Sequence, residues 1–151
     1  MKSKTKIKKR PDKALAEIER ISREFGRGPN AVKVGLPKGS NDYPDGTSVI
    51  MVGAVHEFGS DKMNIPQRSY LRSTVVEKKN DYKRLFRKLS FRIVKGDMNL
   101  KKALGILGLT VQTDVRDKIT DIDSPPLQYR EGNPLVDTGH LRQSITYEVD
   151  E

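Results

Sequence analysis

Two long stretches with helical periodicity stand back to back in the middle of the sequence, and they limit the fold more than any other feature. In the first stretch, one helical face is apolar at Leu71, Val75, Tyr82, Phe86, Leu89 and Ile93. In the second stretch, one face is apolar at Leu100, Leu104, Leu107, Val111, Val115, Ile119 and Ile122. Gly96 lies in the segment 95–99 between them, where a glycine favours the end of a helix. The pattern therefore predicts a long antiparallel helix pair.

Shorter elements flank this pair on both sides. Apolar residues at helical spacing predict a helix over residues 11–25, and alternation predicts a strand over residues 31–36. A short apolar helix is expected at 48–58, with Thr47 as its N-cap and Gly59 at its end. The chain closes with a helical turn near 139–143 and an alternating strand from Ser144 to Val149.

Few strands and several helices indicate an α+β fold. We expect a small antiparallel sheet of two to three strands, in which the C-terminal strand can pair with residues 31–36 and residues 37–47 can supply one more strand. The sheet packs with the long helix pair and the shorter helices. Because so small a sheet is marginal by itself, we expect neighbouring subunits to stabilise the fold in a homo-oligomer.

The composition is that of a modestly packed domain. Hydrophobic residues make up 34% of the chain and charged residues 32%. No segment approaches the roughly 18 apolar residues that a membrane helix needs, so we expect no membrane partner. Cysteine is absent, which excludes disulfides and cysteine-based zinc sites. No apolar run follows the basic N-terminus, so we expect no secretory signal and synthesis in the cytoplasm.

The net charge of +9 is concentrated at the N-terminus. Residues 1–13 hold seven basic side chains and Asp12 alone as an acid, whereas the remaining chain holds 22 basic and 19 acidic side chains. We therefore divide the chain into a basic arm, residues 1–10, and a single domain, residues 11–151. The arm is a candidate for contact with DNA or an acidic protein, or a solvated tail. Its candidate contact residues are Lys2, Lys4, Lys6, Lys8, Lys9 and Arg10.

Searches for catalytic or metal-binding motifs give no reactive group. His56-Glu57 resembles the start of a zinc-binding helix, but Ser60 occupies the position of the second histidine. His140 is the only other histidine, so a metal site would need two distant residues to converge. We expect no catalytic residues, no metal and no cofactor. Basic residues between Lys78 and Arg92 lie mainly off the apolar face, which indicates a solvated surface or one that faces DNA or an acidic partner.

Two motifs carry a resemblance to a known family. The first comprises Val52–Gly59, with the sequence VGAVHEFG, and Ile65–Arg72, with IPQRSYLR; the second is Pro134–Ile145, PLVDTGHLRQSI. Their order and spacing, with a long helical middle between them, resemble the virion-morphogenesis and tail-completion proteins of tailed phages. The residues matched to the family pattern are His56, Glu57, Phe58, Gly59, Pro66, Arg68, Leu71, Pro134, Leu135, Asp137, Thr138, Gly139, Leu141 and Ser144. Ser69 departs from the pattern, which usually has proline there.

The motif residues are also of types that build structure. Gly59 can end a helix, and Arg68 can bond backbone carbonyls or an acid with its planar guanidinium. Asp137 or Thr138 can cap the turn at Gly139, and Leu141 can anchor that turn in the core. We therefore interpret the motifs as a structural joint and not as an active site.

The resemblance implies a structural virion protein that is assembled in the host cytoplasm. Such proteins form rings, often hexameric, at the head-proximal end of the tail, where they join head to tail and DNA passes. The implied partners are further copies of the chain and other neck, connector or tail-terminator proteins. A tail-terminator role that caps the tail tube stays open, and so does a free nucleic-acid-binding protein outside the virion.

Overall fold

The computed structural model describes residues 12–150, apart from residues 28, 30 and 128–130. The arm at residues 1–10 therefore lies outside the described residues. Within the described part, the fold is α+β, with six α-helices and a two-stranded antiparallel sheet that packs against α5. The predicted fold class is thus confirmed, including the contact between the two long helices.

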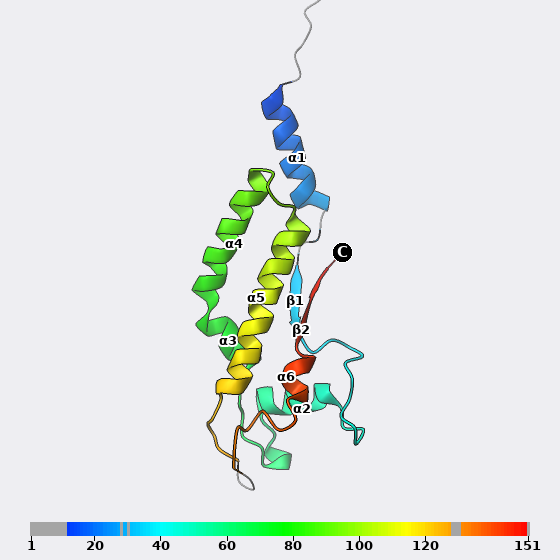
Figure 1. Cartoon of the computed structure of the whole chain (residues 1–151), viewed down its shortest axis with the longest axis vertical. Coiled ribbons are helices and arrows are strands. Elements are labelled where there is room, and N and C mark those ends of the chain that lie inside the picture. Colours follow the sequence, from blue (N-terminus) through cyan, green and yellow to red (C-terminus); the bar gives the residue numbers. More distant parts are fainter. Residues whose placement is uncertain (1–11, 28, 30, 128–130, 151) are drawn as a thin grey trace, which may run out of the picture.

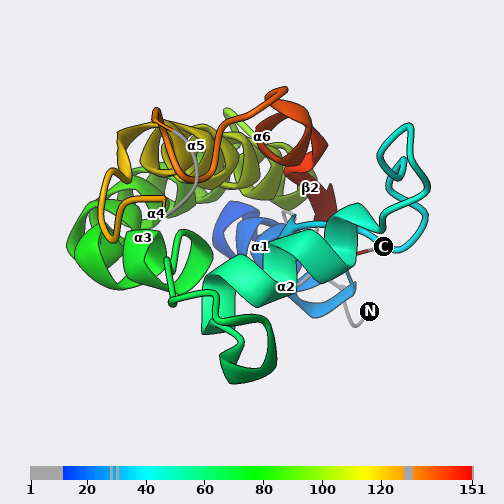
Figure 2. The same ribbon diagram turned by 90° about the horizontal axis from the view of Figure 1, so that it is seen from below.

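The elements follow the order expected from the sequence (Figure 1). They are α1 Lys13–Arg27, β1 Val32–Gly35, α2 Val49–Phe58, the 3-10 turn η1 Asp61–Met63, α3 Leu71–Glu77, α4 Lys79–Val94, α5 Leu100–Asp121, α6 His140–Ser144 and β2 Thr146–Val149. The molecule is elongated, with α1 projecting at one end and α2, α6 and the long loops at the other (Figures 1 and 2). The long helices and the sheet connect the two ends.

The first of the two long helices is interrupted, contrary to the prediction of a single helix from Leu71 to Ile93. Lys78 separates α3 from α4, with a φ of −95° and a ψ of 9°. The hydroxyl of Thr74 donates to the carbonyl of Tyr70 at 2.6 Å, and such a bond to the preceding turn bends a helix. The next two residues, Val75 and Val76, are β-branched, which also disfavours a continuous helix. α5 is continuous, and the Asn99 side chain caps it by accepting from the Lys102 N–H at 2.8 Å.

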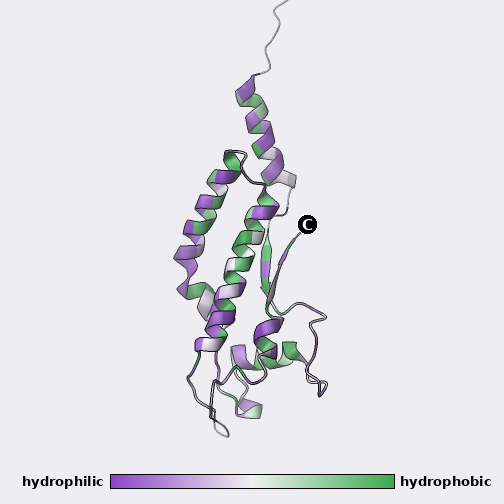
Figure 3. Cartoon of the chain, viewed as in Figure 1, coloured by the Kyte–Doolittle hydropathy of each residue, from purple (hydrophilic) through white to green (hydrophobic). Residues whose placement is uncertain are grey.

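The sheet pairs the two segments that the sequence predicted. Val32 lies opposite Val149, and the register runs to Gly35 opposite Thr146. Gly108 of α5 permits the close approach of the sheet, because a Cβ there would lie 2.5 Å from Cδ2 of Tyr147. Figure 3 shows that the middle of α5 is mostly hydrophobic, in agreement with its position between the sheet and α4.

The segment 37–49 settles two details left by the sequence prediction. The sheet has two strands, the lower number of the predicted two to three, because this segment turns twice, through bonds from Ser40 N–H to the Pro37 carbonyl and from Gly46 N–H to the Tyr43 carbonyl. Thr47 does not cap α2, contrary to the prediction. The N-cap is Ser48, whose side chain makes no capping bond, and Asp42 instead accepts from the Val49 N–H at 3.2 Å.

The core has two parts. One part, at the α2 and α6 end, buries Val49, Tyr70, Val111, Val115, Ile119, Leu135, Leu141 and Ile145. The other part lies between α4 and the first half of α5 and buries Leu89, Ile93, Met98, Leu100, Ala103 and Leu104. Among the described residues, no helix combines the length and the apolar character required to cross a membrane.

Candidate functional site

The two sequence motifs meet at the end of the molecule opposite α1. The first motif forms the end of α2, the loop that follows and the start of α3, and the second forms the loop before α6 and α6 itself. Tyr70 of the first motif and Leu135 and Leu141 of the second share one buried cluster. We call this region, residues 56–72 and 133–145, the joint.

Glu57 connects the end of α2 to the beginning of α3. Its side chain is buried, and its carboxylate accepts hydrogen bonds from the N–H groups of Tyr70, Leu71 and Arg72 at 2.9, 2.9 and 3.1 Å. The hydroxyl of Ser69 donates a fourth bond at 2.7 Å. The first N–H groups of a helix have no partner within the helix, and a negative charge there is favourable. Glu57 therefore caps α3 from a different helix.

Arg68 joins the first motif to the loop that follows α5. Only 4% of this residue is exposed, and its guanidinium donates to the carbonyls of Pro125 and Pro126 at 2.7 and 3.1 Å. The backbone N–H of Arg68 donates to the carbonyl of His56 at 2.8 Å. Backbone carbonyls were one of the two kinds of partner expected for Arg68, and the planar guanidinium reaches two of them at once.

Gly59 permits the sharp change of direction between α2 and the loop. Its φ of 77° and ψ of 170° are accessible to glycine and strained for other residues. A Cβ there would lie 3.0 Å from the backbone nitrogen of Gln67. A β-bridge between Ser60 and Ile65 closes the loop, and Pro66 is exposed on its surface. The loop is thus held mainly by backbone contacts.

The second motif is held by local side-chain bonds and by buried leucines. Asn133 accepts from the N–H groups of Leu135 and Val136 at 2.7 and 2.9 Å, which orders the turn at the start of the motif. The N-cap of α6 is Gly139, so neither Asp137 nor Thr138 occupies the predicted capping position, although Thr138 accepts from the His140 N–H at 3.3 Å. Leu141 is 2% exposed and lies in the core, as its proposed anchoring role requires.

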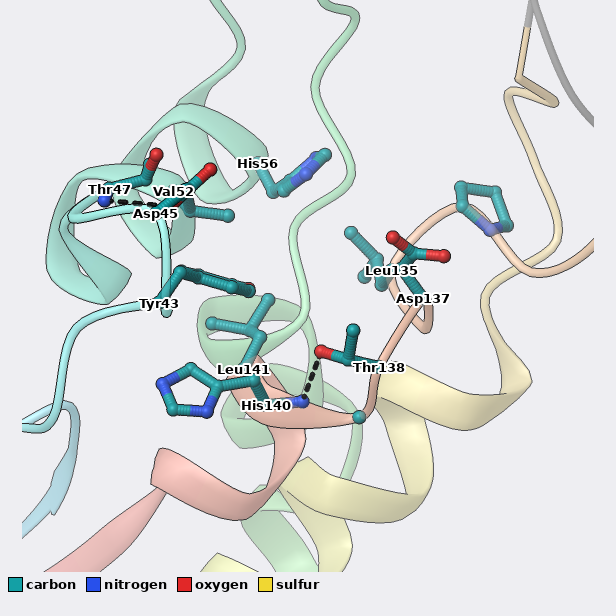
Figure 4. A pocket seen from close by; sticks show the side chains of 12 residues that line it. Tyr43, Asp45, Thr47, Val52, His56, Leu135, Asp137, Thr138, His140 and Leu141 are labelled. Atoms are coloured by element: carbon teal, nitrogen blue, oxygen red, sulfur yellow. Dashed lines mark hydrogen bonds between the residues drawn. The ribbon is translucent and has the colours of Figure 1, made fainter.

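A pocket of about 300 Å³ opens where the motifs come together. Figure 4 shows that its lining comes from three segments: the loop at Tyr43–Thr47, α2 and the second motif. The rings of Tyr43 and His140 lie 4.6 Å apart, and His140 Nε2 is 2.7 Å from the Asn41 carbonyl oxygen. The segment Tyr43–Thr47 thus belongs to the same site.

Two ionisable side chains of this pocket, His56 and Tyr43, favour their neutral forms. Burial, followed by the positive charge of Arg68, lowers the pKa of His56 below its ordinary value. His56 Nδ1 is buried and has no hydrogen-bond partner in the structure. Burial likewise raises the pKa of Tyr43. Asp45 and Asp137 also line the pocket, and the bond from the Thr47 N–H lowers the pKa of Asp45.

The two histidines do converge on this pocket, which the sequence alone gave little reason to expect. Among residues 12–150, less the gaps named above, no group of three or more histidine, aspartate or glutamate side chains is arranged to hold a metal ion.

The motif residue Phe58 does not join the core, since 67% of it is exposed. The contact residues proposed in the arm, Lys2 to Arg10, lie outside the described part.

Several residues of the site were not identified from the sequence. The capping role of Glu57 depends on a chain reversal that brings residue 57 against residues 69–72, and local pattern does not show it. A second network on α5 was also missed, in which Asp114 accepts from Lys78 Nζ at 2.6 Å and from the Tyr82 hydroxyl at 2.9 Å. Burial and this bond raise the pKa of Tyr82.

Comparison with known proteins gave no match: no family model, no curated protein and no solved structure resembles the chain significantly. Its function must therefore be inferred from its own residues and geometry. The site that they define is a bonded joint between two helices and a loop, with a small pocket beside it.

Proposed function

We propose that the chain is a structural virion protein of a tailed phage or prophage. In this proposal it is a tail-completion or neck component that forms a homo-oligomeric ring at the head-proximal end of the tail. Within that ring it would help to join head to tail and surround the passing DNA. The resemblance of the two motifs to phage virion-morphogenesis proteins is the starting point.

The observation that supports this proposal most directly is how the motif residues are engaged. The carboxylate of Glu57 accepts four hydrogen bonds from the start of α3, and the Arg68 guanidinium donates to two backbone carbonyls. Charged groups that are saturated in this way hold backbone segments in place. Motif residues with such contacts are consistent with a structural protein that binds other subunits through its surface.

Exposed apolar side chains also support a role in assembly. Large hydrophobic residues on several helices remain more than half exposed, among them Leu15, Ile18, Met51, Phe58, Val76, Phe91 and Leu109. Scattered apolar residues are ordinary on a protein surface, but a contiguous apolar patch, such as the groove lined by Phe58, Val75 and Val76, marks an interaction surface. A subunit that is covered by its neighbours would have such a patch.

One surface favours a second candidate function, non-specific binding of nucleic acid. α4 carries exposed basic side chains at Lys79, Lys83, Arg84, Arg87, Lys88 and Arg92. Among these, Arg84 is paired with Asp81. Such a surface can face DNA inside a ring, or it can bind DNA in a protein that acts outside the particle.

Electron microscopy of the purified protein, and of particles that lack it, would test the virion proposal. We expect rings from the protein, together with filled heads and tails that fail to join or to stay joined in its absence. Normal infectious particles without the protein would contradict the proposal. A tail-terminator role would instead give tails of irregular length.

Filter binding across a range of salt concentrations would test the alternative. A steep loss of DNA affinity with salt, together with absence of the chain from purified virions, would favour the free nucleic-acid-binding protein. Presence in virions with weak DNA binding would favour the structural role.

A further inference from the structure

The pocket where the two motifs meet is small and partly apolar. Its volume is about 300 Å³, and Val52, Leu135 and Leu141 form an apolar part of its wall. Sites for small molecules usually have volumes of about 300–1,000 Å³, so this pocket is at the lower limit of that range. It therefore suits a single long side chain, inserted from outside, better than a large ligand.

The charged side chains that line this pocket are both acidic. They are Asp45, from the loop before α2, and Asp137, from the loop before α6, and none of the described residues in the lining is a lysine or an arginine. Burial raises the pKa of Tyr43, and the negative charges of Asp137 and Asp45 raise it further, so both carboxylates act on the same hydroxyl. The lining therefore favours a positively charged group.

The other polar groups near the pocket do not oppose a cation. His56 favours its neutral form, because burial, followed by the charge of Arg68, lowers its pKa. Arg68 itself does not line the pocket, since its buried guanidinium donates to the carbonyls of Pro125 and Pro126. Figure 4 shows the ring of Tyr43 among the lining side chains, and an aromatic face attracts a cation. A lysine or arginine can thus place its stem on the apolar wall and its charge near the carboxylates.

The arm is the most basic segment of the chain. Residues 1–10 contain six basic side chains and no acidic one. Helix α4 is also basic, but it includes Asp81, and a helix about 10–12 Å wide does not fit into a pocket of this volume. The arm is therefore the part of the chain whose charge best complements the pocket.

The start of α1 and the pocket lie at opposite ends of one molecule (Figure 1). Along the helix axes, roughly 35–40 Å separate Lys13 from the part of α5 that packs on Leu141. The segment 2–12 spans only about 36–40 Å when it is fully extended. Only the tip of a chain's own arm would reach the pocket, and only at full extension, whereas the arm of a second copy has no such restriction.

We propose that the pocket binds a lysine or arginine side chain from the arm, residues 1–10, of a second copy of the chain. Each copy then donates one arm and accepts another, and a contact between such unlike surfaces can close into a ring. One side chain in a pocket is a small contact, so it links subunits that other surfaces also hold together. This inference rests on the homo-oligomer of the proposed function and names one contact within it.

The chain contains no cysteine, so engineered cysteines report on this contact directly. Thr5→Cys places a thiol in the arm and keeps all its basic side chains, and Thr138→Cys places a thiol at an exposed position of the pocket. When the two full-length chains are mixed with oxidised glutathione, a disulfide-linked heterodimer should form at least about tenfold faster than with Thr113→Cys. Thr113 is the matched control, because it is an exposed threonine on α5 that does not line the pocket.

Removal of the negative charge should abolish this preference. Asp45→Asn and Asp137→Asn, combined in the Thr138→Cys chain, keep an oxygen that can accept hydrogen bonds, including the bond from the Thr47 N–H. Cross-linking to the arm should then slow to the rate of the Thr113→Cys control.

A matched control for charge lies in the same loop. Asp42 accepts from the Val49 N–H at 3.2 Å and does not line the pocket, so Asp42→Asn should leave the fast rate unchanged. Circular dichroism would confirm that these variants are folded. Replacement of the six basic residues of the arm by glutamine should also slow the reaction, and it leaves the folded domain untouched.

Each outcome decides the proposal. Equal rates with Thr138→Cys and Thr113→Cys, or a fast rate that persists in the combined asparagine variant, would overturn it. A diluted chain with both Thr5→Cys and Thr138→Cys that closes an internal disulfide faster than it links to other copies would also overturn it, because the arm would then fill its own pocket.

The same outcomes separate this contact from the proposed function. Rings in electron microscopy, without preferential cross-linking at the pocket, would overturn the contact and leave the ring assembly standing. Preferential cross-linking, together with normal infectious particles in the absence of the protein, would support the contact and contradict the virion role.

Discussion

Arg68 and Arg20 make the same contact at opposite ends of the molecule, with different surroundings. Each guanidinium donates to two consecutive backbone carbonyls of a distant segment, Pro125 and Pro126 in one case and Ile93 and Val94 in the other. Arg68 is 4% exposed, whereas the side chain of Arg20 is 34% exposed. The two arginines show that similar hydrogen bonds can contribute differently to stability. Water competes for the carbonyls bonded by the exposed Arg20, so its bonds should contribute less than those of Arg68.

The same contrast extends to the elements around each arginine. At the joint, polar bonds are buried beside a shared apolar core, so the geometry of α2, α3 and α6 is determined within one chain. At the α1 end, the contacts are polar and partly exposed, and the apolar side of the helix is uncovered. The buried side of the joint is therefore complete in a single subunit, whereas the apolar side of α1, like the exposed Phe58 ring of the joint, is not covered. We expect mutations of buried joint residues to change folding and mutations on α1 to change association.

The largest effect should come from Glu57→Ala. The substitution leaves three N–H groups at the start of α3 without their acceptor, and it should lower the free energy of unfolding by about 3–5 kcal/mol. Urea denaturation followed by circular dichroism would measure it. Glu19→Ala, at an exposed site on α1, is the matched control and should change the free energy by less than about 0.5 kcal/mol. If Glu57→Ala and Glu19→Ala lowered the free energy of unfolding equally, the proposed difference between the joint and α1 would be wrong.

The two arginines give the second prediction. Arg68→Ala should destabilise the fold by about 2–4 kcal/mol, because it removes a buried side chain together with both of its bonds to the loop after α5. Arg20→Ala should cost less than about 1 kcal/mol, because water replaces the guanidinium. Arg68→Lys should recover only part of the loss, since a single ammonium does not reproduce the planar pair of bonds. Denaturation of all three variants would test this order.

Hydrogen exchange would show where the Arg20→Ala effect is located. Amides of α1 should exchange faster in that variant, and amides of α3 and α6 should not change. Faster exchange throughout the molecule would mean that α1 is coupled to the joint more tightly than its contacts indicate.

The contrast also explains which features could be predicted from sequence. Apolar periodicity identified α5 and most of α4, and alternation identified both strands and their pairing, because these patterns follow from burial along one element. The break at Lys78 was missed, because it depends on the Thr74 hydroxyl and on a run of β-branched residues within a stretch that stays apolar on one face. Thr47 was chosen as a cap by residue type, yet Asp42, seven residues before Val49, occupies that role through the turn of the loop.

The site was predictable in its residues and not in its contacts. The motifs pointed to segments that the fold brings together, and Gly59 and Leu141 have the local roles that their types suggest. The bonds of Glu57 to residues 69–72 and of Arg68 to residues 125 and 126 join segments that only the folded chain brings together. The orientation of α1 was hidden for the same reason, since an amphipathic pattern gives the apolar side but not what covers it.

Two glycines with positive φ test the contrast at the level of the backbone. Gly59, at the joint, has a φ of 77° and a Cβ there would meet Gln67 backbone at 3.0 Å; Gly96, near α1, has a φ of 83° and would meet only the end of Arg20 at 3.9 Å. Alanine should cost about 1 kcal/mol at Gly96 from conformational strain and about 2–3 kcal/mol at Gly59, where steric overlap adds to the strain. Thermal and urea unfolding of Gly59→Ala and Gly96→Ala would measure the difference. Equal losses would mean that the loop after α2 can shift, and that the joint is less rigid than its bonds suggest.

The smallest effect should be a pH dependence that belongs to the joint. The pKa of His56 is lowered in the folded state, chiefly by burial and also by Arg68, so the unfolded chain binds a proton more readily. Stability should therefore be fully present above the unfolded value of about 6.5 and decline as the pH falls through the lower folded pKa. His56→Gln should flatten this part of the stability profile between pH 7 and pH 5, by a small amount because the ring is only partly buried. Unfolding at a series of pH values would measure it, and an unchanged profile in His56→Gln would assign the pH dependence to groups other than His56.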